Sequence, residues 1–159
     1  LSMSFNFPTT DELNEQGFDK QFLSALTYVK KHMDDDSNTP IHFGAFIYFW
    51  ERYLFAHADR LSENYKGGSW TLKNGFWCLD SSDQFDVHTG YGAKYTVNAM
   101  EFSIIVNLFA LSHMAITTYQ QKGNEFINLL SVNFSDYIKL LLDRSLEKLN
   151  TEAIYMVTD

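Results

Sequence analysis

YKGGSWTLKNGFWCL, residues 65–79, places two turn signals around two short aromatic runs. Gly67 and Gly68 can take positive φ without a Cβ clash, so the backbone is free to leave a helix there and turn into a strand. Asn74-Gly75 is the dipeptide that type I′ turns prefer, because both central residues of such a turn need positive φ. The stretch therefore predicts a β-hairpin with strands at about 70–72 and 76–79.

The polar segment after the hairpin contains a further strand signal. Residues 84–88 alternate well enough for a third antiparallel strand, with turns at 81–83 and 89–90. We therefore expect an α+β fold in which a small three-stranded antiparallel sheet, built from residues 69–88, packs against about four helices.

The second strand of the hairpin is apolar at all four positions of 76–79. Successive side chains of a strand point to opposite faces, so both faces need cover from helices or from a partner. This leaves two roles open for Trp70 and Trp77. They either pack across the strands onto the helices or contribute to a binding surface, where tryptophan is enriched among hot spots.

Apolar residues at helical spacing predict the helices that supply this cover. Asn98 and Glu101 have the spacing of a capping box, and the helix that they open, to about Thr117, is apolar nearly all round and should be buried. The other predicted helices are Asp19 to Met33, His42 to Asn64, Asn124 to Leu149 with a new cap at Ser135, and a last turn from Thr151 to Val157.

The helix predicted from His42 to Asn64 has aromatic residues on both sides. Its second side carries Tyr48, Phe49 and Phe55 among charged residues. Two interpretations stay open: a central helix covered on both sides, or an aromatic surface patch for a partner.

Composition bounds the domain organisation. The chain has 159 residues, of which 45% are hydrophobic and 16% aromatic, enough for one packed domain. Residues 1–18 have no regular period, so we expect an N-terminal arm whose Phe5 and Phe7 dock on a single domain, 19–159. The first helix should stop within 34–40, where three acids oppose the helix dipole and Pro40 disfavours helical geometry.

The order of several motifs suggests a relationship to known proteins. Tyr-x-Gly-Gly-x-Trp from Tyr65 is followed by Asn-Gly-Phe-aromatic, Phe43-Gly44 opens the preceding helix, and an apolar helix from Tyr95 ends in Leu-Ser-His. Together with the acidic end at 152–159, this order resembles the ArdB/KlcA antirestriction family of plasmids and other mobile elements. The resemblance covers about 41–159. The family usually has more residues between the Trp and the Asn and a second Gly after the Asn.

The resemblance implies a protein that protects incoming mobile-element DNA from type I restriction-modification systems. Its implied partner is the restriction enzyme or an associated host protein, reached through protein contacts without catalysis. The formal charge of −8 argues against direct nucleic-acid binding, which needs clustered Lys and Arg. Two alternatives remain: a protein-binding module with an unrelated regulatory role, and an acidic DNA mimic, which would need carboxylates at phosphate spacing.

Residues with catalytic or metal-binding chemistry do not form a recognisable pattern. The five histidines include no His-Glu-x-x-His arrangement, so no metal or other cofactor is expected. His57 and His113 fit core histidines better than ligands. Cys78, the single cysteine, would need His88 or His113 as a base if the protein were a small enzyme. We therefore expect no catalytic residues.

The compartment follows from the same features. Cys78 has no cysteine to pair with, which fits a reducing compartment. The most apolar stretch, 102–116, is short and interrupted by polar residues, and no leader precedes a cleavage site, so we expect a cytoplasmic protein with no membrane partner.

The candidate residues divide into a structural set and a binding set. We expect the motif to fix the fold through Tyr65, Gly67, Gly68, Gly75 and Phe76. The hairpin tip and the loop at 80–91 should present the contact surface, and the candidate binding residues are Trp70, Lys73, Asn74, Trp77, Asp83 and Asp86.

Overall fold

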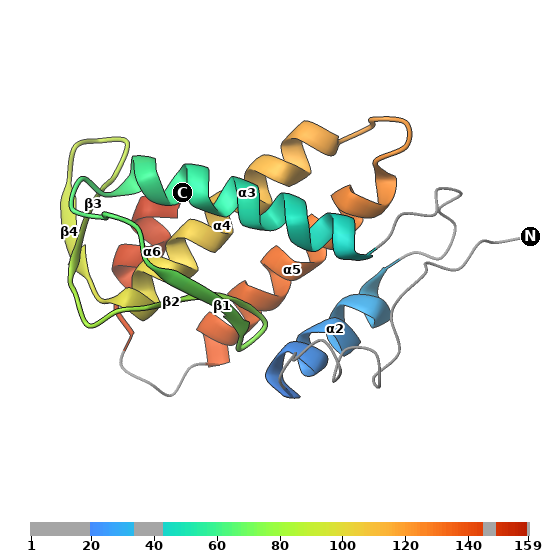
Figure 1. Ribbon diagram of the computed structural model, residues 1–159, viewed down its shortest axis with the longest axis horizontal. Coiled ribbons are helices and arrows are strands. Elements are labelled where there is room, and N and C mark those ends of the chain that lie inside the picture. The colour runs from blue at the N-terminus through green and yellow to red at the C-terminus, as the bar shows by residue number, and fades with distance from the viewer. Residues whose placement is uncertain (1–19, 34–42, 145–148, 159) are drawn as a thin grey trace, which may run out of the picture.

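The computed structural model describes residues 20–33, 43–144 and 149–158, and within these ranges it contains five helices and four strands (Figure 1). The expectations for the N-terminal arm and for the segment 34–40 lie outside the described residues. The helices are α2 (Lys20–His32), α3 (Phe43–Leu61), α4 (Ala99–Thr118), α5 (Glu125–Arg144) and α6 (Thr151–Thr158). The strands are β1 (Ser69–Lys73), β2 (Phe76–Asp80), β3 (Phe85–His88) and β4 (Lys94–Val97). The α+β class predicted from the sequence is confirmed.

Helix α4 lies at the centre of the fold, in contact with α3, α5, α6 and β2 (Figure 1). Asn98 caps it: the side chain accepts from the Glu101 amide, and the Asn98 amide donates to the Glu101 carboxylate, each at 2.8 Å. This is the predicted capping box. By length and composition α4 would suit a membrane span, but 67% of its apolar 18-residue stretch is buried inside the protein.

Strands β1 and β2 form the hairpin predicted from Asn74-Gly75. Lys73 pairs with Phe76 across the turn, and the two residues between them have φ values of 61° and 88°. All four residues from Phe76 to Leu79 are buried, so both faces of β2 are covered, as their apolar character requires.

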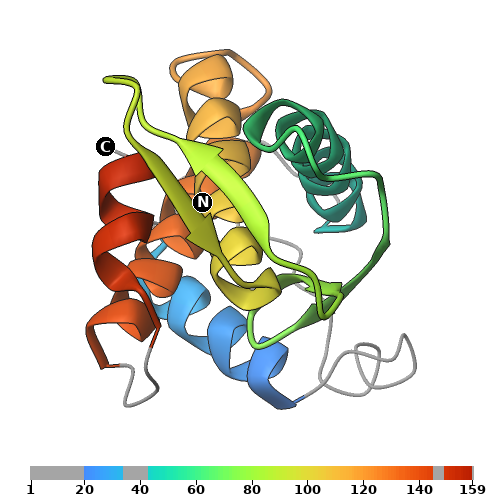
Figure 2. The same ribbon diagram turned by 90° about the vertical axis from the view of Figure 1, so that its left-hand side faces the viewer.

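The predicted three-stranded sheet is wrong. The strand expected at 84–88 exists as β3, but it pairs with β4 and not with the first hairpin, which gives two separate two-stranded sheets. Figure 2 shows the second hairpin lying across α4, between α3 and α6. Strand β4 was missed because the polar, glycine-containing segment 80–95 concealed its first residues.

Polar side chains of α4 form hydrogen bonds with the backbone of β2 on the edge where a third strand was expected. The Trp77 amide donates to Asn107 Oδ1 at 3.2 Å, and Asn107 Nδ2 donates back to the Trp77 carbonyl at 2.7 Å. One step along, the Leu79 amide donates to Ser103 Oγ at 2.9 Å. Asn107 and Ser103 are fully buried, so they satisfy backbone groups that would otherwise be costly.

The helices differ from expectation in three respects. Five are present among the described residues, where about four were expected, because 151–158 forms a complete helix. Helix α5 continues through Ser135, which does not cap a new helix. The second side of α3 is not covered: Tyr48, Phe49 and Phe55 are 54%, 40% and 42% exposed, which contradicts a helix buried on both sides.

Candidate functional site

The Tyr-Gly-Gly-Trp motif closes an aromatic cluster at the end of α3. The Trp70 indole donates to the Tyr65 hydroxyl at 2.8 Å, and both rings lie against Phe102 of α4. Phe85 of β3 stacks on Phe102 with ring centroids 4.5 Å apart. Gly67, with φ of 93°, provides the turn between the two motif aromatics. The motif therefore joins α3, β1, β3 and α4 in one contact network.

The tip of the first hairpin is packed against helices and does not project into solvent. A Cβ on Gly75 would lie 2.6 Å from Tyr137 Cε1 and 2.8 Å from Ala25 Cβ, so only glycine permits this approach. Asn74 is half-buried, and Lys73 is exposed beside it. Of the two residues expected to form a contact surface at the tip, Lys73 and Asn74, only Lys73 is exposed.

Both candidate tryptophans are buried. Trp70 is 9% and Trp77 is 8% exposed, and the Trp77 indole Nε1 has no hydrogen-bond partner among the described residues. Trp70 and Trp77 therefore pack in the core and do not present a contact surface.

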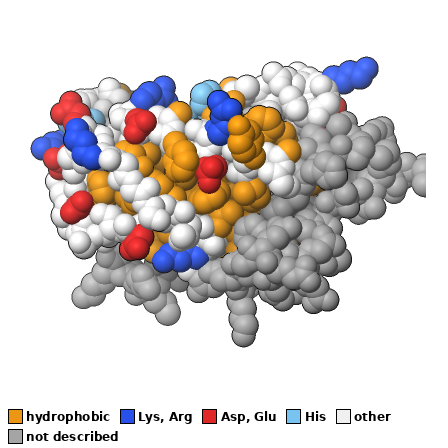
Figure 3. Space-filling model, in the orientation of Figure 1, with side chains coloured by type: hydrophobic (Ala, Val, Ile, Leu, Met, Phe, Trp, Pro, Cys, Tyr) orange, Lys and Arg blue, Asp and Glu red, His pale blue; other side chains and the backbone are white. Residues whose placement is uncertain are grey.

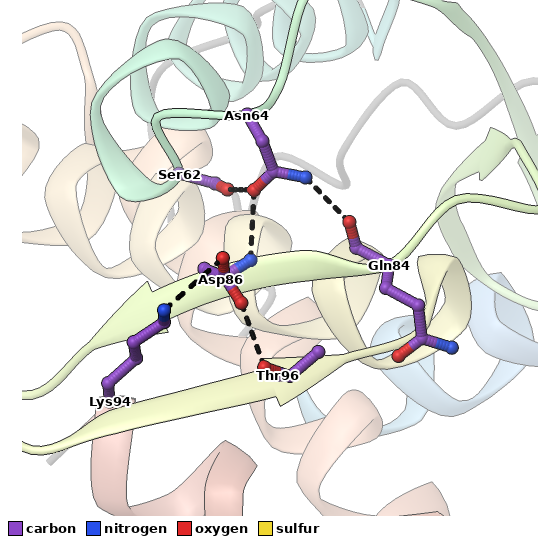
Figure 4. Close-up of polar contacts among 6 residues, drawn as sticks. All are labelled: Ser62, Asn64, Gln84, Asp86, Lys94 and Thr96. Atoms are coloured by element: carbon purple, nitrogen blue, oxygen red, sulfur yellow. Dashed lines mark hydrogen bonds and ion pairs between the residues drawn. The ribbon is translucent and has the colours of Figure 1, made fainter.

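The structure brings Asp86 into a polar network between α3 and the second hairpin (Figure 4). Asn64, just after α3, is the hub of this network. Its Oδ1 accepts from the Asp86 amide at 3.0 Å and from Ser62 Oγ at 2.7 Å, and its Nδ2 donates to the Gln84 carbonyl at 2.6 Å. One amide side chain thus ties β3 to the end of α3.

The Asp86 carboxylate faces β4. It accepts a hydrogen bond from Thr96 Oγ1 at 2.8 Å and lies 3.5 Å from Lys94 Nζ (Figure 4). The Thr96 hydrogen bond, followed by the charge of Lys94, holds the pKa of the Asp86 carboxyl below its usual value. Asp86 is therefore ionised at neutral pH.

Around this network lies an open polar pocket of about 420 Å³, lined by Glu63, Asn64, Lys66, Asp86, His88 and Lys94. It mixes both signs of charge. Asp83 lies nearby in the chain, exposed, with its amide bonded to Ser81 Oγ at 3.0 Å. Within the described ranges, no group of three His, Cys, Asp or Glu side chains is placed to hold a metal ion.

The six candidate binding residues do not form one surface. The β1–β2 register puts Lys73 at the turn and Asp80 at the open end of the hairpin, so the length of a five-residue strand, about 14 Å, separates Lys73 from the loop that leads to Asp83. Sequence reasoning also missed Asn64, Lys94 and Thr96. Asn64 follows a helix, and Lys94 is the first residue of a strand hidden in polar sequence. Only the hairpin pairing reveals that both lie beside Asp86.

No protein-family model and no curated protein matches the sequence. A solved structure does match, with a TM-score of 0.58 and 19% sequence identity, over 73% of this chain and 81% of the other. The chain has the KlcA/ArdB fold. That structure is described as a novel fold with antirestriction activity against type I DNA restriction systems in vivo but not in vitro.

The resemblance inferred from the motifs is thereby confirmed for the fold. In this version of the KlcA/ArdB fold the hairpin has a two-residue turn, with Asn74 and Gly75 alone between the paired Lys73 and Phe76. The tip of this hairpin lies against α2 and α5, as the Tyr137 and Ala25 contacts of Gly75 show.

Proposed function

We propose that this protein protects incoming plasmid or other mobile-element DNA from type I restriction in a bacterial cell. It acts in the cytoplasm, by contact with the restriction enzyme or an associated host protein. The observation that carries the proposal is the fold shared with KlcA and ArdB, whose reported activity is directed against type I systems.

A role without catalysis is supported by how the reactive side chains are placed. His57 and His113 lie 3.0 Å apart, but the pocket that they line contains no carboxylate or cysteine among its described residues. Cys78 is 2% exposed and donates to the Lys73 carbonyl at 3.4 Å. A nucleophile, a base and an accessible cleft therefore do not coincide.

Contact with protein also fits the surface better than imitation of DNA. A DNA mimic needs a stripe of carboxylates at phosphate spacing. On the face drawn in Figure 3, acidic side chains lie singly among basic and hydrophobic ones. This face therefore does not present the carboxylate stripe that competition for a DNA site would need.

For the contact surface we propose the loop and pocket around Asp83 and Asp86. Both side chains leave at least part of their carboxylate accessible, and the Asn64 network fixes the strand on which Asp86 lies. Lys73, at the opposite end of the first hairpin, is a separate position. The variants Asp83→Ala with Asp86→Ala, and Lys73→Ala alone, distinguish the two regions.

The test is the plating efficiency of unmodified phage on cells that carry a type I restriction system, with and without this protein expressed. Modified phage on the same cells controls for any general effect on infection. Restored plating of unmodified phage is expected. Unchanged plating, with soluble protein shown to be present, would overturn the proposal and favour a protein-binding module with another role.

A further inference from the structure

Helix α3 carries two exposed arginines that form no ion pair with a carboxylate among the described residues. Arg52 and Arg60 are two of the three arginines in a chain with a net charge of −8. Both are exposed, and the ion pair found in the described part of the chain, Lys94–Asp86, involves neither. In an acidic protein, arginines without a carboxylate partner are available to bind an anion.

The two arginines line one pocket between α3 and α4. It has a volume of about 550 Å³ and is lined by Phe49, Arg52, Tyr53, Ala56, His57, Arg60 and His113. Arg60 follows Arg52 by eight positions, a rise of about 12 Å along a helix, so one lies toward each end of the pocket. Figure 3 shows basic, histidine and hydrophobic side chains next to one another on the upper part of this face, where α3 runs.

A chain of hydrogen bonds sets the direction of the donors in this pocket. Arg60 Nη2 lies 2.9 Å from His57 Nδ1, and a guanidinium only donates, so that nitrogen accepts and the His57 proton is on Nε2. His57 Nε2 lies 3.0 Å from His113 Nδ1, which must then accept. His113 therefore carries its proton on Nε2, and no acceptor for it is present among the described residues.

The surroundings of His57 and Arg52 maintain these hydrogen-bond directions at neutral pH. Burial, followed by the charge of Arg60, lowers the pKa of His57 to about 4, so its ring is neutral. At the other end, the Arg52 guanidinium lies 5.7 Å from the centre of the Tyr48 ring and donates to the Tyr48 hydroxyl at 3.0 Å. Both ends of the pocket thus present oriented donors.

Beside this basic pocket lies a smaller, mainly apolar one. It has a volume of about 130 Å³ and shares Phe49 and Tyr53 as a wall; its other lining residues are Met114, Thr117, Thr118, Gln121, Asn124 and Ile127. Phe49 is 40% exposed at the boundary. A pocket lined by two arginines and an apolar pocket therefore adjoin across the rings of Phe49 and Tyr53.

We propose that these paired pockets bind a segment of a partner protein that carries an Asp or Glu side chain next to an apolar side chain. The carboxylate accepts from Arg52 or Arg60 and from His113 Nε2, and the apolar side chain enters the smaller pocket past Tyr53. A nucleic acid fits less well, because a duplex of many phosphates is repelled by a net charge of −8 and two arginines neutralise few of them. This inference does not depend on the antirestriction proposal.

The test is selection of random heptapeptides displayed on phage against the purified protein. Peptides with Asp or Glu beside an aliphatic or aromatic residue should be enriched. Synthetic versions should bind about tenfold more weakly to Arg52→Gln with Arg60→Gln, as expected when a charge-assisted hydrogen bond is lost. Lys139→Gln removes an exposed charge from a different pocket and should leave binding unchanged.

Three results would overturn the proposal. The first is enrichment without acidic residues, and the second is equal binding by the double arginine variant. The third is failure to select any peptide while adenosine monophosphate binds wild-type protein and not the variant, which would assign the pocket to nucleotides. Two-dimensional ¹H–¹⁵N spectra of the imidazoles give an independent readout. They should show the proton on Nε2 in both His57 and His113, and acidic peptides should shift the His113 signal.

Discussion

The side-chain amide of Asn107 pairs with the backbone of Trp77 as a neighbouring strand would, accepting from its amide at 3.2 Å and donating to its carbonyl at 2.7 Å. A helix residue thus completes the edge of a strand in the core. Both backbone groups depend on one buried side chain, because no third strand pairs with the first hairpin among the described residues.

Replacing Asn107 with Leu should destabilise the protein by about 2–4 kcal/mol, since it leaves a buried donor and a buried acceptor unpaired. Urea unfolding measures the change. Asn133→Leu is the matched control, because Asn133 is also buried but bonds only to Leu129 of its own helix. Equal losses for the two variants would contradict a special role for Asn107.

Gly75→Ala should cost more stability than Gly67→Ala. Both glycines have positive φ, 88° and 93°, where a Cβ costs about 1–2 kcal/mol. Only at Gly75 does the added Cβ also meet Tyr137 and Ala25; at Gly67 it meets nothing within 4 Å. Thermal unfolding of the two variants isolates the steric cost at the hairpin tip, and equal shifts would show that the tip does not press against α2 and α5.

Stability should fall as the pH drops from 6.5 toward 4. His57 has a pKa of about 4 in the folded protein against 6.5 as its ordinary value, so the unfolded chain binds an extra proton in this window. The loss from this residue should reach about 2 kcal/mol by pH 5. Chemical unfolding at pH 7 and pH 5 measures it, and His57→Gln should reduce the difference. An unaltered pH dependence in that variant would rule out His57 as its source.

Asn64→Ala should loosen the second hairpin locally. The substitution removes the acceptor of the Asp86 amide and the donor to the Gln84 carbonyl, both near the surface. Hydrogen exchange should quicken at Asp86 and its neighbours, while amides of the first hairpin, such as Leu79, keep their protection. Equal acceleration in both hairpins would indicate global destabilisation and not a local tie.

Local signals in the sequence predicted local structure well. Asn74-Gly75 gave the turn of the first hairpin, and Asn98 with Glu101 gave the start of α4, because each depends on residues within four positions of one another. The pairing of β3 depends on a short, polar β4 further along the chain, and the edge of β2 depends on Asn107, 30 residues away. Such long-range partners leave no periodic trace in one sequence.

The same limit applies to the candidate site. Asp86 was predicted as a binding residue of the 80–91 region, but its partners Asn64 and Thr96 become visible only when α3 and β4 are placed beside it. His57 and His113, predicted as core residues, form a bonded pair across two helices, of which His57 is buried and His113 is exposed. Burial of Trp70 and Trp77 follows from the cover that α4 supplies.

One plating comparison would decide the proposed function. Cells with a type I restriction system receive unmodified phage while expressing wild-type protein, the Asp83→Ala/Asp86→Ala variant, the Lys73→Ala variant, or none. We predict that wild type raises the plating of unmodified phage toward that of modified phage, and that the double Asp variant, folded and equally abundant, loses most of this effect. Wild-type protein that leaves plating at the level of cells without it would contradict the antirestriction role. Full protection by the double variant would remove the Asp83–Asp86 surface from it.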